Sequence, residues 1–184
     1  MSKRIAYLAA AAFSALSLTS TFVAPARAEE KTVMVGGAAM YPSKNIIQNA
    51  VNSKDHTTLV AAVKAAGLVQ TLEGKGPFTV FAPTNTAFGK LPAGTVDTLV
   101  KPENKATLTK ILTYHVVPGK LEAADLKDGQ TLKTVEGEQL TVKREGKNVM
   151  IVDAKGGTSM VTIPNVNQSN GVINVVDTVL MPAS

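Results

Sequence analysis

The stretch ILTYHVVPG, residues 111–119, places one of the chain's two histidines in its most strongly aliphatic neighbourhood. We expect residues 113–117 to form a β-strand, with His115 and Tyr114 on opposite faces. A buried imidazole needs a hydrogen-bond partner, because an unsatisfied buried polar group costs about 1–3 kcal/mol. Catalysis by a general base would require a nucleophile and a cleft open to water, and the neighbouring sequence offers neither. We therefore interpret His115 as a structural residue.

The N-terminus has the pattern of an export signal. Lys3 and Arg4 precede an apolar run over residues 5–18, and Ala26-Arg27-Ala28 fits a small-residue cleavage site. The run is shorter than the ~20 residues of a membrane-spanning helix. We therefore expect cleavage after Ala28, no membrane segment in the mature chain, and a periplasmic or extracellular location.

Charge and cysteine content exclude several classes of protein. The chain has 19 Lys and Arg against 14 Asp and Glu, and loss of the three basic residues within 1–28 leaves 16, so the net charge falls from +5 to +2. Basic residues do not cluster with aromatic ones, so we expect no nucleic-acid partner. The chain has no cysteine, which excludes disulfides and thiolate metal sites. The rest of the chain suits one domain stabilised by packing.

Helical patterns dominate the part of the chain that follows the signal. Residues 29–42 are rich in small residues and predict a flexible lead-in. Ser43 is expected to cap a helix over 44–52. Asp55 is expected to cap the next helix, which Gly67 ends in a left-handed conformation.

Strand patterns dominate the second half of the chain. An apolar strand is expected at 77–83, and from Thr113 onward a period of two replaces the helical period of 103–112. Turn signals at Gly146 and at Asn170-Gly171 separate closely spaced strands. Helices thus precede a mainly antiparallel sheet, an order typical of the α+β class.

Sequence patterns for catalysis are absent. No G-x-S-x-G, H-E-x-x-H, phosphate-loop or dinucleotide-binding pattern occurs, and two histidines cannot complete a three-histidine metal site. Glu136 and Glu138 flank a glycine and are interpreted as solvated charges rather than an acid/base pair. His56 follows the cap-like Asp55 and is interpreted as a solvent-exposed residue. We expect neither an enzyme nor a bound metal or cofactor.

Three motifs occur in order along the chain: TVFAPTNTAF (79–88), ILTYHVVPG (111–119) and GVINVVDTVLMP (171–182). Together they resemble the fasciclin-like domain over residues 43–182, and single-domain secreted bacterial members are the most similar type. The resemblance implies an α+β fold: a wedge-shaped β-sandwich of about seven strands with helices packed at one end. It also implies an extracellular role in adhesion.

The resemblance assigns structural roles to residues of the first and last motifs. Aromatic residues of the first motif are expected in the core, and Thr84 or Asn85 is expected to cap the helix that follows. The last motif is expected to form a strand covered on both faces, in which Asn174 and Asp177 need polar partners. The structural positions carried over are Thr79, Val80, Phe81, Pro83, Thr84, Asn85, Phe88, Val172, Ile173, Asn174, Val176 and Asp177.

The middle motif carries the candidate binding residues. In animal members of the family, a tyrosine-histidine pair with flanking aliphatic residues is associated with integrin recognition. The same residues also suit core packing, and a bacterial protein is not expected to have integrin as its normal partner. The matching candidate partner-binding positions are Ile111, Leu112, Tyr114, His115, Val116 and Val117.

Two classes of function compete at this point. The first is a secreted, non-enzymatic module for cell adhesion, which binds a cell-surface or envelope protein or polysaccharide and gains affinity by multivalent display. The second is a carrier of an apolar small molecule such as a carotenoid, which some fasciclin-like proteins bind. Such a ligand needs apolar walls. The candidate wall residues are Met34, Met40, Val96, Leu99 and Val100.

Overall fold

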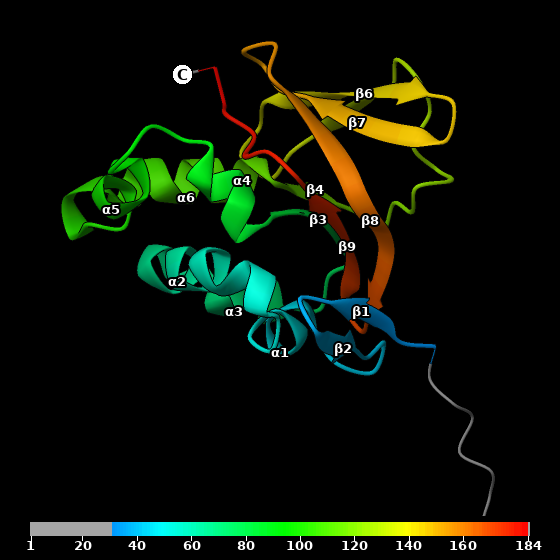
Figure 1. Ribbon diagram of the computed structural model, residues 1–184, viewed down its shortest axis with the longest axis horizontal. Coiled ribbons are helices and arrows are strands. Elements are labelled where there is room, and N and C mark those ends of the chain that lie inside the picture. The colour runs from blue at the N-terminus through cyan, green and yellow to red at the C-terminus, as the bar shows by residue number, and fades with distance from the viewer. Residues whose placement is uncertain (1–30, 184) are drawn as a thin grey trace, which may run out of the picture.

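The computed structural model describes residues 31–183 and contains one large sheet with a group of short helices beside it (Figure 1). The signal peptide expected over 1–28 lies outside the described residues. The strands are β1 (Val33–Val35), β2 (Ala38–Met40), β3 (Phe78–Pro83), β4 (Val116–Pro118), β5 (Thr131–Lys133), β6 (Gln139–Glu145), β7 (Asn148–Val152), β8 (Thr158–Gln168) and β9 (Gly171–Val176). The helices are α1 (Ile46–Ala50), η1 (Lys54–His56), α2 (Thr57–Ala66), α3 (Val69–Glu73), α4 (Asn85–Gly89), α5 (Thr95–Leu99), η2 (Pro102–Asn104) and α6 (Lys105–Tyr114).

The large sheet has seven strands in the order β4-β3-β9-β8-β7-β6-β5. Strands β3 and β9 lie near one end of this order and pair in parallel, from Phe78 opposite Gly171 to Pro83 opposite Val176. Every residue of β9 is buried, as expected for a strand covered on both faces. The other pairs are antiparallel, so the prediction of a mainly antiparallel α+β sheet is confirmed.

Strand β8 bends the sheet back on itself. Its pairing with β9 shifts register between Val161 and Ile163 and again between Ile163 and Val166, and such bulges increase local bending and twist. The two ends of the strand order meet where the Val135 N–H donates to the carbonyl of Val116 at 2.8 Å. The bend therefore produces a nearly closed, sandwich-like sheet.

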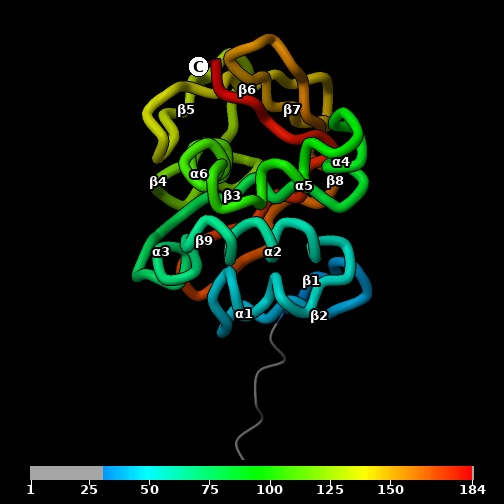
Figure 2. Tube along the Cα trace, turned by 90° about the vertical axis from the view of Figure 1, so that its left-hand side faces the viewer, coloured from blue at the N-terminus to red at the C-terminus, as the bar shows by residue number. Residues whose placement is uncertain are grey.

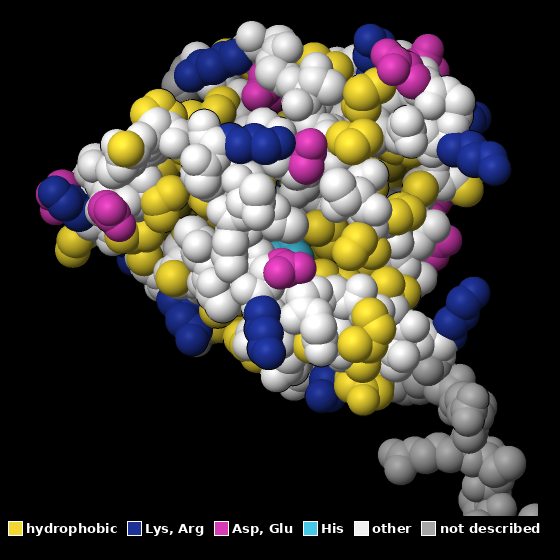
Figure 3. All heavy atoms as spheres, in the orientation of Figure 1, with side chains coloured by type: hydrophobic (Ala, Val, Ile, Leu, Met, Phe, Trp, Pro, Cys, Tyr) yellow, Lys and Arg dark blue, Asp and Glu magenta, His cyan; other side chains and the backbone are white. Residues whose placement is uncertain are grey.

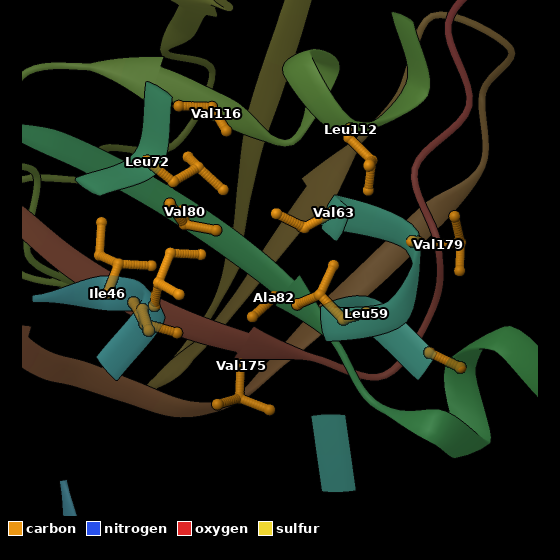
Figure 4. Packing of buried hydrophobic residues seen from close by; sticks show 14 of the residues in the cluster. Ile46, Leu59, Val63, Leu72, Val80, Ala82, Leu112, Val116, Val175 and Val179 are labelled. Atoms are coloured by element: carbon orange, nitrogen blue, oxygen red, sulfur yellow. The ribbon is translucent and has the colours of Figure 1, made fainter. Parts of the chain in front are cut away.

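The interior contains two apolar clusters, a helix-side cluster and a sheet-side cluster. The first lies between the helices and the sheet, where Leu59 and Val63 of α2 point toward Val80 and Ala82 of β3 (Figure 4). The second lies inside the bent sheet and contains Phe81, Tyr114, Val117, Leu126, Leu132, Leu140, Val142, Val149, Ile151, Val176 and Leu180. Fully burying an aliphatic or aromatic side chain of this size contributes about 1.5–3 kcal/mol.

The helices form two tiers on one side of the sheet. Figure 2 shows α1, α2 and α3 in one tier and α4, α5 and α6 in the other, and α2 packs directly against α6. Gly67 ends α2 with a φ of 75°, as predicted. Thr84 caps α4 by accepting a hydrogen bond from the Ala87 N–H at 3.2 Å, also as predicted.

Three local expectations differ from the structure. Asn45, not Ser43, caps α1, because Asn45 and Gln48 form a reciprocal capping box. Within the expected flexible lead-in, β1 and β2 form a hairpin around Gly36-Gly37, whose φ values are 57° and 77°. Residues 113–114 continue α6 rather than opening a strand. The Thr113 hydroxyl donates to the carbonyl of Thr109 four residues back, a contact that helical geometry supplies.

Candidate functional site

Tyr114 and His115 lie at the end of α6, where the two apolar clusters meet. Tyr114 is completely buried in the sheet-side cluster. Its hydroxyl donates to the carbonyl of Gln139 at 3.0 Å and accepts from the Ala154 N–H at 2.9 Å. Burial raises the pKa of Tyr114, so the phenol stays neutral and works as a hydrogen-bonding tether between β6 and the turn after β7.

Both ring nitrogens of His115 have backbone partners. Nδ1 lies 2.8 Å from the carbonyl of Ile111, and Nε2 lies 2.9 Å from the Leu180 nitrogen. A carbonyl only accepts and an N–H only donates, so Nδ1 carries the proton and Nε2 accepts. Burial lowers the pKa of His115 to about 4, although the hydrogen bond to Ile111 and the charge of Asp153 oppose that shift. The imidazole is therefore neutral near pH 7 and fully engaged in structure.

All six candidate partner-binding residues are in the interior, each with at most 6% of its surface exposed. Ile111, Leu112 and Val116 belong to the helix-side cluster, and Tyr114 and Val117 belong to the sheet-side cluster. A partner that touches the folded domain does not reach these side chains.

Residues of the first motif hold distant segments together. Thr79 donates to the carbonyl of Gly119 at 2.7 Å and accepts from the Leu121 N–H at 2.8 Å. Asn85 accepts from the Thr58 N–H at 3.0 Å and donates to the carbonyl of Lys54 at 2.8 Å. Asn85 therefore caps the N-terminus of α2 from another helix. The expected cap, Asp55, lies instead within the η1 turn, and α2 has no cap from its own preceding residue.

The polar residues of the last motif have the partners that burial requires. Asn174 is fully buried and accepts from the Asn165 N–H at 3.0 Å. Asp177 accepts from the Met160 N–H at 2.9 Å and pairs with Lys90 at 3.3 Å. Partial burial alone would raise the pKa of Asp177, but the hydrogen bonds from Met160, Thr178 and Lys90 hold it below its usual value.

The structure places His56 and Glu136, both interpreted from the sequence as solvent-exposed, in largely buried positions. His56 has only 3% of its surface exposed and packs among apolar residues. The sequence carries only a weak signal of the burial of His56. The apolar residues Val35 and Met40 of the β1–β2 hairpin, 16 to 21 positions earlier in the chain, line the same apolar cavity as His56. Glu136 pairs with Lys110 at 3.5 Å, and its side chain has 12% of its surface exposed.

Several large apolar side chains are exposed on the surface of the domain. On the face shown in Figure 3, hydrophobic side chains gather along β8 and over the β1–β2 hairpin, while basic and acidic side chains are dispersed. Met34 on β1 and Met160 on β8 are 59% and 40% exposed. Elsewhere Tyr41, Val51 and Val135 are also exposed.

Within residues 31–183, no helix is long and apolar enough to cross a membrane. In the same described part of the chain, no three His, Asp or Glu side chains gather closely enough to hold a metal ion.

A nearly closed seven-stranded sheet, helices along one side and a buried tyrosine-histidine pair define the structural class of the domain. The family model of the Fasciclin domain matches residues 54–182. The chain belongs to the fasciclin domain family, and the resemblance drawn from its three motifs is confirmed.

Several relatives align over most of the chain. "Protein sll1483" of Synechocystis sp. is 46% identical over 179 residues, which span 97% of this chain and 95% of that protein. "Immunogenic protein MPB70" of Mycobacterium bovis is 35% identical, over 95% of this chain and 96% of that protein. "Cell surface glycolipoprotein MPB83" of the same species is 39% identical, over 80% of this chain and 64% of that protein.

A solved structure shares the fold. The FAS1 domain pair from the insect cell adhesion molecule Fasciclin I superimposes with a TM-score of 0.68 at 19% identity. The match covers 77% of this chain and 52% of that one, so this chain spans about half of the two-domain structure. The expected seven-stranded fold with helices at one end is therefore confirmed.

Proposed function

We propose that the protein is an exported, non-enzymatic binding module that attaches to a cell-surface or envelope protein or polysaccharide. Membership of the fasciclin domain family carries this proposal. The name of MPB83 places that relative at the cell surface, and the solved domain pair comes from a cell adhesion molecule. The proposal includes cleavage of residues 1–28 after Ala28 and action in the periplasm or outside the cell.

The interior role of the motif residues supports a scaffold function. Tyr114, His115, Asn85 and Asn174 use their polar side-chain atoms to bind backbone groups, and except for the bond from His115 to Ile111 these groups lie outside their own helix or strand. Contact with a partner then falls to exposed residues on loops and on the outer face of the sheet. A single small patch of this kind binds weakly, so useful affinity requires several copies displayed together.

The exposed apolar side chains of β8 and the hairpin are the proposed contact surface. Met34 and Met160 lie on this surface and are well exposed. Replacing both with serine is expected to weaken capture of envelope material by the immobilised protein without changing its thermal unfolding. The matched control is Val135→Ser, which alters an exposed apolar side chain beside β4 on another part of the surface.

Two measurements test the function itself. The purified protein is used to retain partners from envelope extracts, and attachment of cells that lack the gene is compared with the parent strain. We expect one retained component whose capture depends on Met34 and Met160, and reduced attachment of the deletion strain. Equal attachment of both strains, together with capture that is insensitive to the surface variants, would refute the proposal.

A further inference from the structure

Methionine is the source of all the sulfur in this chain. The sequence contains six methionines and neither cysteine nor tryptophan. Within residues 31–183 the methionines differ widely in exposure: Met34 and Met160 have 59% and 40% of their surface exposed, whereas Met40 has 2%. A dissolved oxidant reaches a thioether only where the side chain meets solvent. Met34 and Met160 are therefore the sulfur atoms that such an oxidant meets first.

Met160 has a second thioether beside it. Met150 of β7 lies directly opposite Met160 of β8 in the register of the two strands. The residues that flank them, Val149, Ile151 and Ser159, are buried, so alternation along a strand places both methionines on the outer face of the sheet. Directly opposed side chains have Cβ atoms about 4.5–5.5 Å apart. Met160 is the more exposed member of this pair, because Met150 is only half-buried and not exposed.

The backbone of Met160 is fixed independently of its side chain. Its N–H donates to Oδ1 of Asp177 at 2.9 Å, and its carbonyl accepts from the Asp177 N–H at 3.1 Å. Met34 is likewise held in the hairpin, where it lies opposite Ala39. A chemical change at either sulfur atom therefore alters the surface of the domain and leaves these backbone contacts in place.

We propose that Met34 and Met160 form a reversible oxidation site, at which a peroxide converts each thioether to a sulfoxide. A lone pair of the sulfur attacks one oxygen of the peroxide, so an S–O bond forms as the O–O bond breaks. The proton of the transferred hydroxyl passes to the departing oxygen, which leaves as water when the oxidant is hydrogen peroxide. The sulfur loses two electrons and the peroxide gains them. A methionine sulfoxide reductase reverses the step with two thiols, which become a disulfide and release water.

Oxidation changes the polarity of the surface on which both residues lie. A thioether is a flexible apolar group that packs against apolar partners, whereas a sulfoxide carries a polar oxygen that accepts hydrogen bonds. An apolar partner offers that oxygen no donor, so contact leaves it desolvated and unpaired. The consequence for binding rests on the contact surface proposed above. There, one unpaired polar group is expected to weaken binding about tenfold.

Treatment of the purified protein with hydrogen peroxide, followed by peptide mass spectrometry, tests the site. We expect Met34 and Met160 to gain one oxygen atom each before Met40 does, with Met150 at an intermediate rate. Thermal unfolding of the protein oxidised at Met34 and Met160 is expected to match that of the untreated protein. Oxidation of Met40 at the same rate as Met34 and Met160 would overturn the proposal.

Retention on a phenyl-substituted resin measures the change in polarity without a natural partner. Peroxide is expected to reduce retention, and a methionine sulfoxide reductase with dithiothreitol is expected to restore it. The double variant Met34→Leu, Met160→Leu keeps apolar side chains but has no sulfur at these positions, so its retention is expected to survive peroxide. The control Met40→Leu is expected to remain as sensitive as the parent. Equal loss of retention in the double variant and the parent would overturn the proposal.

Capture of envelope material by the same samples separates this proposal from the proposed function. We expect peroxide to weaken capture by the parent about tenfold and to leave capture by the double variant unchanged. Capture by the parent that is unaffected by full oxidation of Met34 and Met160 would overturn the effect on binding. Selective, reversible oxidation in a protein that captures nothing before treatment would refute the proposed function and support the oxidation site.

Discussion

His115 accepts, through Nε2, a hydrogen bond from the backbone N–H of Leu180 at 2.9 Å, and this contact joins the middle motif to the last one. The next residues of the same C-terminal segment are held in the same way. The Met181 N–H donates to Asp153 at 3.0 Å, and the Ala183 N–H donates to Glu138 at 2.7 Å. Three side chains from three parts of the chain thus fix residues 180–183.

Replacing His115 with phenylalanine tests its structural role. The change removes the acceptor of the Leu180 N–H and leaves that donor buried, which is expected to lower the free energy of unfolding by about 1–3 kcal/mol. Urea unfolding near neutral pH measures the loss. Full retention of stability would show that the imidazole is not a structural tie.

His56→Phe is the matched control for this experiment. The Nε2 of His56 has no partner to lose, although the Ser53 hydroxyl loses its contact with Nδ1. Exchange of an unsatisfied buried polar group for an apolar one of similar shape is close to neutral. We expect a change within about 1 kcal/mol, and a loss equal to that of His115→Phe would contradict the assignment of partners.

Stability is expected to fall as pH drops from about 6.5 toward 4. Burial lowers the pKa of His115 to about 4 in the folded chain, against 6.5 in the unfolded chain. Between these values the unfolded state binds the proton and the folded state does not, so acid favours unfolding. The full effect of this group is about 3 kcal/mol, present above pH 6.5 and lost near pH 4.

Urea unfolding at pH 7.0, 5.5 and 4.5 measures this dependence. Burial also lowers the pKa of His56, so its contribution has the same sign. The variant His115→Phe is expected to show a shallower dependence than the parent. Equal slopes in both proteins would locate the acid sensitivity elsewhere.

Asn85→Ala is expected to destabilise the domain through the start of α2. The change removes the acceptor of the Thr58 N–H and the donor to the Lys54 carbonyl. Loss of a helix cap costs about 0.5–2 kcal/mol. Thermal unfolding measures it, with Asp55→Ala as the control, because Asp55 makes no cap to α2 and is expected to have little effect. A larger loss of stability in Asp55→Ala than in Asn85→Ala would show that Asp55 caps α2.

Gly171→Ala is expected to disrupt the pairing of β3 with β9. An added Cβ would lie 2.0 Å from the carbonyl oxygen of Phe78, so one of the two paired strands must move. We expect a loss of more than about 4 kcal/mol, or failure to fold. Gly146→Ala, at the open hairpin turn with a φ of 61°, is expected to cost about 1–2 kcal/mol. Comparable unfolding temperatures for the two variants would contradict this reasoning.

Local patterns in the sequence predicted the elements that depend on neighbouring residues. Gly67 ends α2, Thr84 caps α4, and Asn170-Gly171 turns β8 into β9, as expected. The three motifs gave the family and, through it, the arrangement of strands. These features follow from short-range geometry or from a pattern shared with relatives.

Contacts over long sequence distances explain the errors. The cap of α2 comes from Asn85, which lies 27 positions beyond Thr58 in the chain. Sequence rules for helix caps consider only the residues next to the start of the helix, so they do not identify it. His56 is buried because its cavity also receives residues of β3 and of a hairpin that was expected to be flexible. Apolar alternation in 113–117 suggested a strand, but packing of Leu108, Ile111 and Leu112 against the sheet extends the helix to Tyr114.

The parallel partner of β3 is the last strand of the described chain, and this order constrains how the protein reaches its folded form. A chain that is synthesised from its N-terminus contains β3 long before β9. Without β9, β3 has β4 as its only neighbour in the sheet. His115 Nε2 also lacks the hydrogen bond from the Leu180 N–H, which follows β9 in the chain. The sheet is therefore completed only when the final segment is present, and a chain without β9 leaves one edge of β3 unpaired.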